Sequence, residues 1–275
     1  MKFRLFREYG ARNSPPIFDA FEQGVKKIGM NLSNDNDAIP VIWSVLWHGR
    51  MLPNKTIYQR CKINNLPVII IEVGNLKRGS TWRISLNHVN NLGNFGLGDL
   101  DYDRPKKLGI NLKSQTKNNE SILIACQHQF SEQWPTNKSV SEWVIETVRS
   151  ARKYTDRKII VRPHPRFSIS LIQNDFVIEK PIKVPSTYDD YNINYDYHCV
   201  INHNAGPGVQ SLIHGTPVIC DESSLAYPLS NKIEFIESLK LPEREKWLID
   251  ITHKEWTVSE IAQGLPLIRL MRSLS

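Results

Sequence analysis

Cysteine is scarce in this sequence, and long apolar runs of the kind found in signal peptides and membrane spans are not seen. The 275 residues include Cys61, Cys126, Cys199 and Cys220, with no CxxC pair and no Cys/His ligand spacing, which argues against a disulfide framework or a zinc ribbon. No apolar run approaches the ~20 residues that span a bilayer, and the start, MKFRLFREYGARN, is charged where a signal peptide is apolar. We therefore expect a cytoplasmic protein with reduced thiols and no membrane partner.

The common nucleotide motifs are also absent. The chain has neither the Walker loop GxxxxGK[ST] nor GxGxxG, which weighs against ordinary triphosphatases and dinucleotide enzymes. The segment GDLDYDR, residues 98–104, contains overlapping DxD spacings, which can hold a divalent ion on a diphosphate. It follows a Gly-rich stretch far from the phosphate-binding candidates below, so we interpret it as an acidic loop and expect no metal site.

Positive charge is concentrated in the first part of the chain. Residues 1–115 contain 17 Lys+Arg against 9 Asp+Glu, whereas residues 116–275 contain 18 against 19, so the formal net charge of +7 comes from the first part. Such an excess is typical of a protein with a polyanionic partner, although a Lys-rich soluble surface gives the same count.

The apolar pattern predicts two α/β blocks. The runs IPVIWSVLW (39–47) and LPVIIIEVGN (66–75) flank a helical segment, as in a βαβ unit of a parallel sheet. After the polar stretch SQTKNNE (114–120) the pattern restarts with SILIACQ, a helix opened by Ser139 and Glu142, and KIIVR. We expect domains at 1–115 and 116–255, and a C-terminal helix in 256–275 that packs back on the first domain.

The segment CVINHNAGPGVQSLIHGTPVICDES (199–223) carries the main functional signal. It predicts a strand, a loop of small residues, a helix with Pro207 in its first turn, and a second strand. Parallel α/β sheets bind ligands beyond the carboxyl ends of their strands, where the helix N-terminus attracts an anion. VRPHPR (161–166) predicts a second strand-end loop, whose Arg and His side chains can hold phosphate oxygens or form an ordinary turn.

These segments resemble the donor-binding half of GT-B glycosyltransferases. The order RPHP, then HNAGPGVQSLIHGTPVI, is similar to the branch with capsule polysaccharide and Kdo-type transferases, and so are the segments 72–96 and 245–264. With its basic first half, the chain resembles the tailed-phage enzymes that glycosylate 5-hydroxymethylcytosine in DNA. The resemblance implies two Rossmann-like domains that face a central cleft, with the acceptor on the first and the donor on the second.

The resemblance also implies the chemistry. The donor is a UDP-sugar, arabinose being favoured over glucose, no cofactor is required, and the enzyme is a monomer in the cytoplasm of an infected bacterial host. The donor would be bound by Arg162, His164, His203, Asn204, Gly206, Gly208, Gln210, Ser211, Glu222 and Ser223.

Inverting chemistry also needs a general base from the first domain, for which the candidates are Glu72, His48 and Asp101. Glu72 places a charge at the end of an apolar strand, which favours it as the base. The alternative is that Glu72 is a structural carboxylate at the strand exit, paired with Arg78 or Arg83.

DNA as the acceptor requires basic side chains along its backbone and an aromatic group beside the extruded base. The candidates are Lys77, Arg78, Trp82, Arg83, Arg104 and Lys106. Two alternatives stay open: a transferase that builds capsule or lipopolysaccharide, since the motifs belong to the donor half, and a nucleic-acid-binding protein without enzymatic activity. The absence of a helix-turn-helix or zinc motif weighs against the second.

Overall fold

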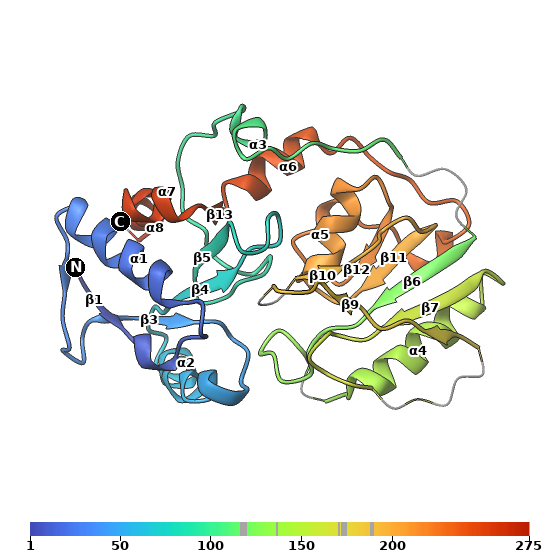
Figure 1. Ribbon diagram of the computed structural model, residues 1–275, viewed down its shortest axis with the longest axis horizontal. Helices are drawn as coiled ribbons and strands as arrows, with labels where there is room; N and C mark the ends of the chain where they lie inside the picture. The colour runs from blue at the N-terminus through green and yellow to red at the C-terminus, as the bar shows by residue number, and fades with distance from the viewer. Residues whose placement is uncertain (116–119, 136, 170, 172–174, 188–189, 275) are drawn as a thin grey trace. The chain divides into compact units, whose positions relative to one another are not determined.

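The computed structural model describes residues 1–275 except 116–119, 136, 170, 172–174, 188–189 and 275. The chain forms two compact units: unit 1 comprises Met1–Leu108 and Leu248–Ser275, and unit 2 comprises Gly109–Trp247. The sequence predicts the first boundary between residues 115 and 116, and the structure has it after Leu108. It predicts the second between residues 255 and 256, and the structure has it after Trp247. Residues 116–119 of the predicted polar linker lie outside the described part. The predicted mixed α/β class with parallel sheets is confirmed (Figure 1).

The sheet of unit 1 is mostly parallel, with an antiparallel edge. Over the described residues its order is β13-β5-β4-β3-β1-β2; β2, β1, β3 and β4 pair in parallel, whereas β5 is antiparallel to both of its neighbours. The strands are β1 (Lys2–Leu5), β2 (Asn31–Leu32), β3 (Ile39–Trp43), β4 (Ile69–Val73), β5 (Trp82–Leu86) and β13 (Glu255–Trp256).

Both faces of this sheet are buried, which explains its apolar strands. In β4, Ile69 and Ile71 face the cluster with α1 and the C-terminal helices, whereas Ile70 faces the cluster with α2. Gly24 of α1 approaches Ile261 of α7 so closely that a Cβ there would lie 2.3 Å from its carbonyl oxygen. The helical elements are α1 (Pro15–Lys27), α2 (Asn54–Ile63), α3 (Arg104–Lys107), α7 (Val258–Ala262), α8 (Leu265–Arg272), η1 (Arg7–Tyr9) and η2 (Gly49–Met51).

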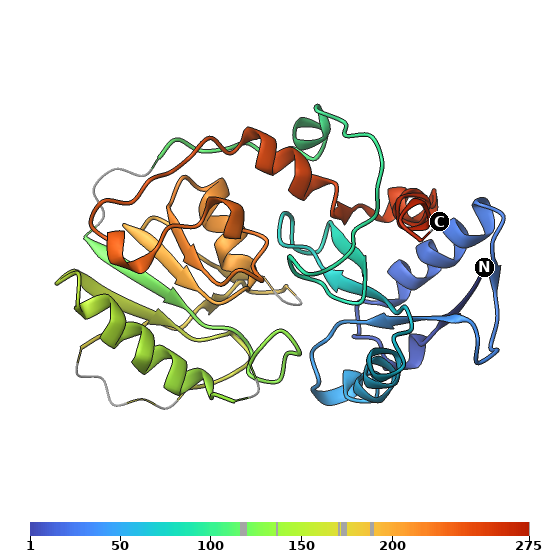
Figure 2. The same cartoon turned by 180° about the vertical axis from the view of Figure 1, so that it is seen from behind.

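Unit 2 contains a sheet that is parallel throughout, in the order β12-β11-β6-β7-β8 over the described residues. Its strands are β6 (Ser121–Ala125), β7 (Lys158–Arg162), β8 (Val177–Ile178), β11 (Cys199–Asn202) and β12 (Val218–Cys220); β9 (Ile182–Lys183) and β10 (Tyr191–Asn192) form a separate antiparallel pair. Its helical elements are α4 (Val140–Arg152), α5 (Gly206–Ile213), η3 (Tyr227–Leu229) and η4 (Ile233–Phe235) (Figure 2).

Helix starts follow the sequence signals closely. Ser139 and Glu142 form the expected capping box of α4, and Thr257 forms a second one with Glu260 at the start of α7. Helix α6 (Glu245–Thr252) contains the boundary between Trp247 of unit 2 and Leu248 of unit 1. None of the helices in the described part of the chain is long and apolar enough to span a membrane.

Candidate functional site

The carboxyl edge of the unit 2 sheet gathers most of the predicted donor-binding residues. Because its strands are parallel, the loops that follow β6, β7, β11 and β12 leave the sheet at the same edge. The sequence singles out the exits of β7, β11 and β12. The structure adds the exit of β6, QHQFSEQW (127–134), whose polar and aromatic side chains contact the others.

Asn204, after β11, is the centre of a buried polar network. Its Nδ2 donates hydrogen bonds to Ser223 Oγ (2.8 Å) and to the Gln133 carbonyl oxygen (3.1 Å). Ser223 Oγ in turn donates to Asp221 Oδ1 (2.6 Å), and the backbone N–H of Asn204 donates to Gln127 Oε1 (3.4 Å). The network joins the exits of β6, β11 and β12, so it brings the predicted residues Asn204 and Ser223 together.

Two acceptor oxygens in this network have no hydrogen-bond partner among the described residues. They are Asn204 Oδ1 and Gln133 Oε1, and both atoms are buried. Buried carbonyl oxygens need a donor, because desolvation without a hydrogen bond costs about 1–3 kcal/mol. A ligand or water with hydroxyl or amine hydrogens would satisfy them, which suits the ribose, base or sugar of a nucleotide-sugar.

His203 lies beside this network, on Trp134. The two ring centroids are 5.3 Å apart in an edge-on arrangement, and His203 Nδ1 is 4.0 Å from Asp221 Oδ2. Burial lowers the pKa of His203 below its ordinary value of 6.5, more than the nearby Asp221 raises it. The imidazole is therefore neutral near pH 7 and can offer a ligand a hydrogen bond but no charge.

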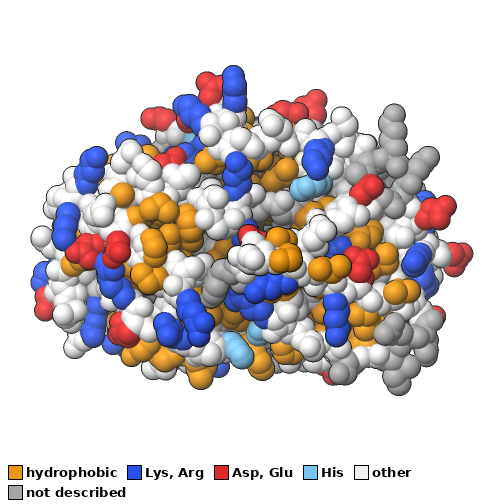
Figure 3. Space-filling view, viewed as in Figure 1, with side chains coloured by type: hydrophobic (Ala, Val, Ile, Leu, Met, Phe, Trp, Pro, Cys, Tyr) orange, Lys and Arg blue, Asp and Glu red, His pale blue; other side chains and the backbone are white. Residues whose placement is uncertain are grey.

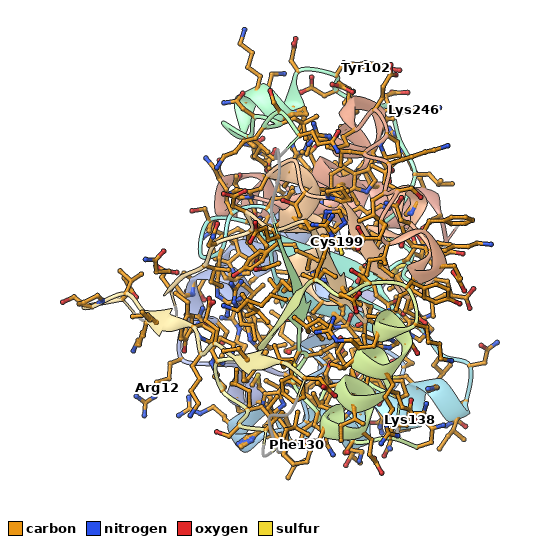
Figure 4. The ribbon with its side chains drawn as sticks, turned by 90° about the vertical axis from the view of Figure 1, so that its right-hand side faces the viewer. Arg12, Tyr102, Phe130, Lys138, Cys199 and Lys246 are labelled. Carbon is orange, nitrogen blue, oxygen red and sulfur yellow. The ribbon has the colours of Figure 1, made fainter. Side chains whose placement is uncertain are left out.

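The exits of β6 and β7 meet in an aromatic cluster. The His128 ring is 5.0 Å from His164, 5.3 Å from Phe167 and 5.7 Å from Phe130, measured between centroids. Phe130 is 50 % exposed and projects outward (Figure 4), so the cluster presents an apolar ring at this edge. His164 therefore lies at the edge as predicted, and its Nδ1 accepts the backbone N–H of Arg166 (3.1 Å).

Arg162 is buried and committed to its own unit. Its Nη1 donates to the Asn194 carbonyl oxygen (2.9 Å), and its Nη2 donates to Tyr197 Oη (2.7 Å) and Glu179 (3.2 Å). These contacts tie the end of β7 to the segment before β11. The diphosphate contact expected of Arg162 is not supported by this placement, because the guanidinium serves neighbouring protein groups.

Helix α5 has Pro207 in its first turn as predicted, but it already starts at Gly206, and two of its residues serve packing. A Cβ at Gly208 would lie 2.7 Å from Asn202 Oδ1, so glycine lets the helix approach β11. Ser211 is fully buried and its hydroxyl donates to the Gly208 carbonyl oxygen (2.9 Å), so no donor contact is supported there. Gln210 is half-buried in the same helix, and Glu222 is exposed after β12. The N-cap, Ala205, supplies no side-chain cap.

In unit 1, Glu72 lies near the carboxyl end of β4, and Ser44 follows β3. Since β3 and β4 are parallel, both residues lie at one edge, where Ser44 Oγ donates to Glu72 Oε2 (2.7 Å) and the Val73 N–H donates to Oε1 (2.9 Å). Ser44 is buried with φ 63°, a left-handed conformation that costs a non-glycine residue about 1–3 kcal/mol. Such strain is commonly kept at functional sites, which favours Glu72 among the three predicted base candidates.

The other two base candidates lie in different surroundings. Asp101 binds Lys107 Nζ (2.6 Å), whose hydrogen bond holds the Asp101 pKa below its ordinary value. A carboxylate with a lowered pKa is a weaker base. His48 is exposed before η2. Glu72 lies opposite Arg83 in the ladder of β4 and β5, and the ion pair with Arg78 or Arg83 that was the alternative stays a prediction.

Among the comparisons with known proteins, only the one with solved structures gives a match. No protein-family model matches the sequence, and no curated protein matches it. Two solved structures of Thermosulfurimonas dismutans KpsC do match: the beta Kdo 2,7 transferase (TM-score 0.50, 13 % identity, 98 % of this chain and 99 % of that one) and the beta Kdo 2,4 transferase (TM-score 0.52, 12 % identity, 97 % and 98 %). The chain has a glycosyltransferase-like fold. The expected resemblance to Kdo-type transferases is confirmed at this level, and the narrower one to phage DNA glycosyltransferases stays a prediction.

Within this glycosyltransferase-like fold, three of the residues expected to bind DNA are structural. Trp82 and Arg83 are buried in β5, and the Arg83 guanidinium donates to the Val89 carbonyl oxygen (2.6 Å) and twice to that of Val73. Arg104 is 7 % exposed and binds groups of the C-terminal segment. DNA contacts by these three are therefore not supported.

The remaining predicted DNA contacts, Lys77, Arg78 and Lys106, are exposed on unit 1. On the face shown in Figure 3, the Lys and Arg side chains form separate groups with apolar and acidic side chains between them. The view shows no continuous basic face on that side of the molecule.

A buried acid that the sequence does not reveal supports the loop carrying Lys77 and Arg78. Glu255, in β13, accepts hydrogen bonds from Thr81 Oγ1 (2.7 Å) and from the backbone N–H groups of Asn75 (2.5 Å) and Leu76 (3.1 Å). Burial raises the pKa of Glu255. Glu255 is 174 or more residues away from these partners in the sequence, so the local sequence does not indicate that they interact.

A second acid–base feature of the C-terminal segment leads to a pH prediction. His253 is buried; its Nδ1 donates to the Ile249 carbonyl oxygen (2.7 Å), and its Nε2 accepts the Asp101 N–H (2.9 Å), which requires a neutral ring. Burial lowers the His253 pKa below 6.5. Folding therefore favours the neutral form, and the stability it contributes is complete above pH 6.5 and declines as the pH falls toward the lower folded value.

We expect the free energy of unfolding, measured with urea at pH 7.5 and 5.5, to fall more in the unaltered protein than in His253→Gln. Glutamine does not titrate, so this part of the pH dependence should disappear. An identical drop in the two proteins would contradict the prediction.

Proposed function

We propose that this chain is a glycosyltransferase that binds a nucleotide-sugar at the carboxyl edge of the unit 2 sheet. The observation that supports this most is the Asn204 network, which holds two buried, unpartnered acceptor oxygens at the edge where such sheets bind ligands. The exposed ring of Phe130, in the loop after β6 at the same edge, offers a stacking surface for a base or a sugar. A UDP-sugar donor without a further cofactor, and the GT-B arrangement that the sequence resemblance implies, are parts of this proposal.

Glu72 is the general base that we propose for an inverting reaction. The acceptor hydroxyl oxygen forms a bond to the anomeric carbon, the bond from that carbon to the phosphate oxygen breaks, and the nucleoside diphosphate leaves with the bonding electrons. The hydroxyl proton passes to Glu72, whose Oε2 is held by Ser44. A retaining reaction would not need this base in the same way.

A saccharide is the acceptor that the comparisons favour. Both solved structures are named as Kdo transferases, so we propose a surface polysaccharide or its lipid-linked precursor as the recipient. The second candidate is the hydroxymethyl group of 5-hydroxymethylcytosine in DNA, with arabinose or glucose as the sugar. The charge of unit 1 favours it: 19 Lys+Arg against 12 Asp+Glu give +7, whereas unit 2 has 16 of each.

A transfer assay distinguishes these candidates. Radiolabelled UDP-glucose, UDP-arabinose and nucleotide-activated Kdo are each incubated with a lipid-linked glycan, DNA containing 5-hydroxymethylcytosine and unmodified DNA. We expect label in the glycan. Label in the modified DNA alone would establish the second candidate. Retention of DNA on the protein without transfer from any donor would overturn the enzymatic proposal in favour of a nucleic-acid-binding protein.

Asn204→Leu tests the donor site directly. The substitution removes the hydrogen bonds to Ser223 and Gln133 and leaves those groups unpaired, so we expect the affinity for the nucleoside diphosphate to fall about tenfold or more. Calorimetric titration measures this loss.

Asn231→Leu is the matched control for this variant. Asn231 also links backbone groups, at Lys240 and Val218, and Val218 begins β12 at the other edge of the sheet. This control should lose stability and keep its affinity. Equal affinities in both variants would contradict the site.

A further inference from the structure

Three charged side chains lie in one row across the antiparallel edge of the unit 1 sheet, where β4, β5 and β13 are neighbours (Figure 1). In the register of these strands, Arg83 of β5 lies opposite Glu72 of β4 on one side and opposite Glu255 of β13 on the other. Residues directly opposite each other in neighbouring strands project from the same face of a sheet. The row therefore places one guanidinium between two carboxylates.

This row lies on the face of the sheet opposite α1, α7 and α8. Trp82 and Trp256, which adjoin Arg83 and Glu255 in their strands, belong to the apolar cluster that covers the first face. Because side chains alternate along a strand, Arg83 and Glu255 project to the other face. Both are buried, so water screens the charges of this part of the row only weakly.

The buried Arg83 interacts with both carboxylates through its charge. Its guanidinium donates hydrogen bonds to backbone carbonyl oxygens. Burial lowers the pKa of Arg83, the charges of Glu72 and Glu255 both raise it, and the charge of Arg78 lowers it. The same cation thus serves two acids, one near the exit of β4 and one in the C-terminal segment.

We propose that Glu255 is a positioning residue that acts on Glu72 by offsetting the charge of Arg83. A cation beside a carboxylate stabilises the ionised form and makes the group a weaker base. Glu255 offsets that cation, and across two strand spacings, about 10 Å, it also repels the ionised form of Glu72. Both effects favour transfer of a proton to Glu72. The role of Glu72 as the base rests on the proposed function, whereas the coupling of the three charges does not.

The hydrogen bonds of Glu255 give a simpler reason for an acid at this place. They hold the loop after β4 through Thr81 Oγ1 and the backbone N–H groups of Asn75 and Leu76. A neutral oxygen can also accept such bonds, so they do not by themselves explain a carboxylate opposite a buried cation. The two roles differ in one measurable respect, because only the electrostatic role changes the titration of Glu72.

Titration of the glutamate carboxyl groups by NMR tests the proposal on the full-length protein. With glutamate labelled by carbon-13 at the carboxyl group, the signals are followed through the acid range in the unaltered protein and in Glu255→Gln. The signal of Glu72 is assigned from its absence in Glu72→Gln. The matched control is Thr81→Val, which removes a hydrogen bond to Glu255 in the same loop and leaves every charge in place.

We expect the titration midpoint of Glu72 to fall by about 0.5–1 pH unit in Glu255→Gln and to stay unchanged in Thr81→Val. An unchanged midpoint in Glu255→Gln, or an equal fall in both variants, would overturn the proposal. Coupling of this kind is reciprocal, so Glu72→Gln should lower the midpoint of Glu255 by a similar amount. This second measurement decides the question if Glu255→Gln does not fold, and an unmoved Glu255 would then overturn the coupling.

Transfer rates give a readout that is tied to the proposed function. With the donor and acceptor identified by the transfer assay, Glu255→Gln should lower kcat about threefold and leave the KM for the donor unchanged, as expected for a weaker base. A shifted titration with an unchanged kcat would confirm the coupling and contradict Glu72 as the base. The two proposals therefore fail separately.

Discussion

Glu72→Gln is expected to lower the rate of sugar transfer about 10²–10⁴-fold at saturating donor and acceptor, which is the usual contribution of a general base. Glutamine keeps the size of the side chain, and its carbonyl oxygen can still accept one of the two hydrogen bonds, from the Ser44 hydroxyl or from the Val73 N–H, so the edge formed by β3 and β4 should be largely retained. The affinity for the nucleoside diphosphate should be unchanged, because the donor residues belong to unit 2. Initial rates with the donor and acceptor identified by the transfer assay measure the effect.

Asp101→Asn is the matched control for this substitution. Like Glu72→Gln, this substitution replaces a carboxylate of unit 1 by the corresponding amide. The hydrogen bond from Lys107 holds the pKa of Asp101 below its ordinary value. We expect this variant to keep most of its activity. Full activity of Glu72→Gln together with an inactive Asp101→Asn would transfer the role of base to Asp101.

Arg104→Met is expected to have the largest effect on stability, about 3–5 kcal/mol, as for the loss of one partner of a buried ion pair. Arg104 forms a two-bond ion pair with Glu260, one bond of which is 3.0 Å, and donates to the carbonyl oxygens of Thr252 and Glu255, each at 2.7 Å. Its guanidinium also lies 4.6 Å from the ring centroid of Trp256. Methionine fills the space but leaves these acceptors unpaired. Urea unfolding of the two proteins at pH 7.5 gives the difference.

Lys106→Met removes a positive charge two residues away and provides the comparison. Lys106 is exposed, so this variant should unfold within about 0.5 kcal/mol of the unaltered protein. If Arg104 instead contributed only to a basic surface, the two variants would be equally stable, and both would weaken the binding of polyanions.

The sequence predicts the elements of this fold better than it predicts their partners. The run IPVIWSVLW indicates a buried strand, yet β3 ends at Trp43 because Ser44 adopts a left-handed conformation that no periodicity reveals. The apolar pattern does not reveal the first strand, β1, or the antiparallel strand β5. The segment KFRL is short and charged, and the basic loop before Trp82 and Arg83 makes both residues candidates for DNA contacts, although a buried Trp is the commoner outcome.

For the candidate site, rules about strand ends proved more informative than residue types. They place Asn204, Ser223 and His164 at one edge of a sheet, and the same rule applied to β6 would have added Gln127, His128 and Gln133. Residue type misleads for arginine: Arg83, Arg104 and Arg162 are positive in the sequence, but each donates to carbonyl oxygens inside its own unit. Whether a guanidinium serves the protein or a ligand depends on long-range contacts, which local sequence does not encode.

Unit 1 is assembled from two segments that flank unit 2 in the sequence, and this has a consequence for biosynthesis. When the ribosome has made residues 1–247, β5 has no β13 beside it, and the apolar side of α1, including Phe18 and Phe21, has no α7 or α8 to cover it. Unit 2, a continuous segment, can fold while the nascent polypeptide is still attached. The N-terminal part therefore keeps these apolar groups exposed until residues 248–275 have been translated, and this interval is longer than for a unit formed by one continuous segment.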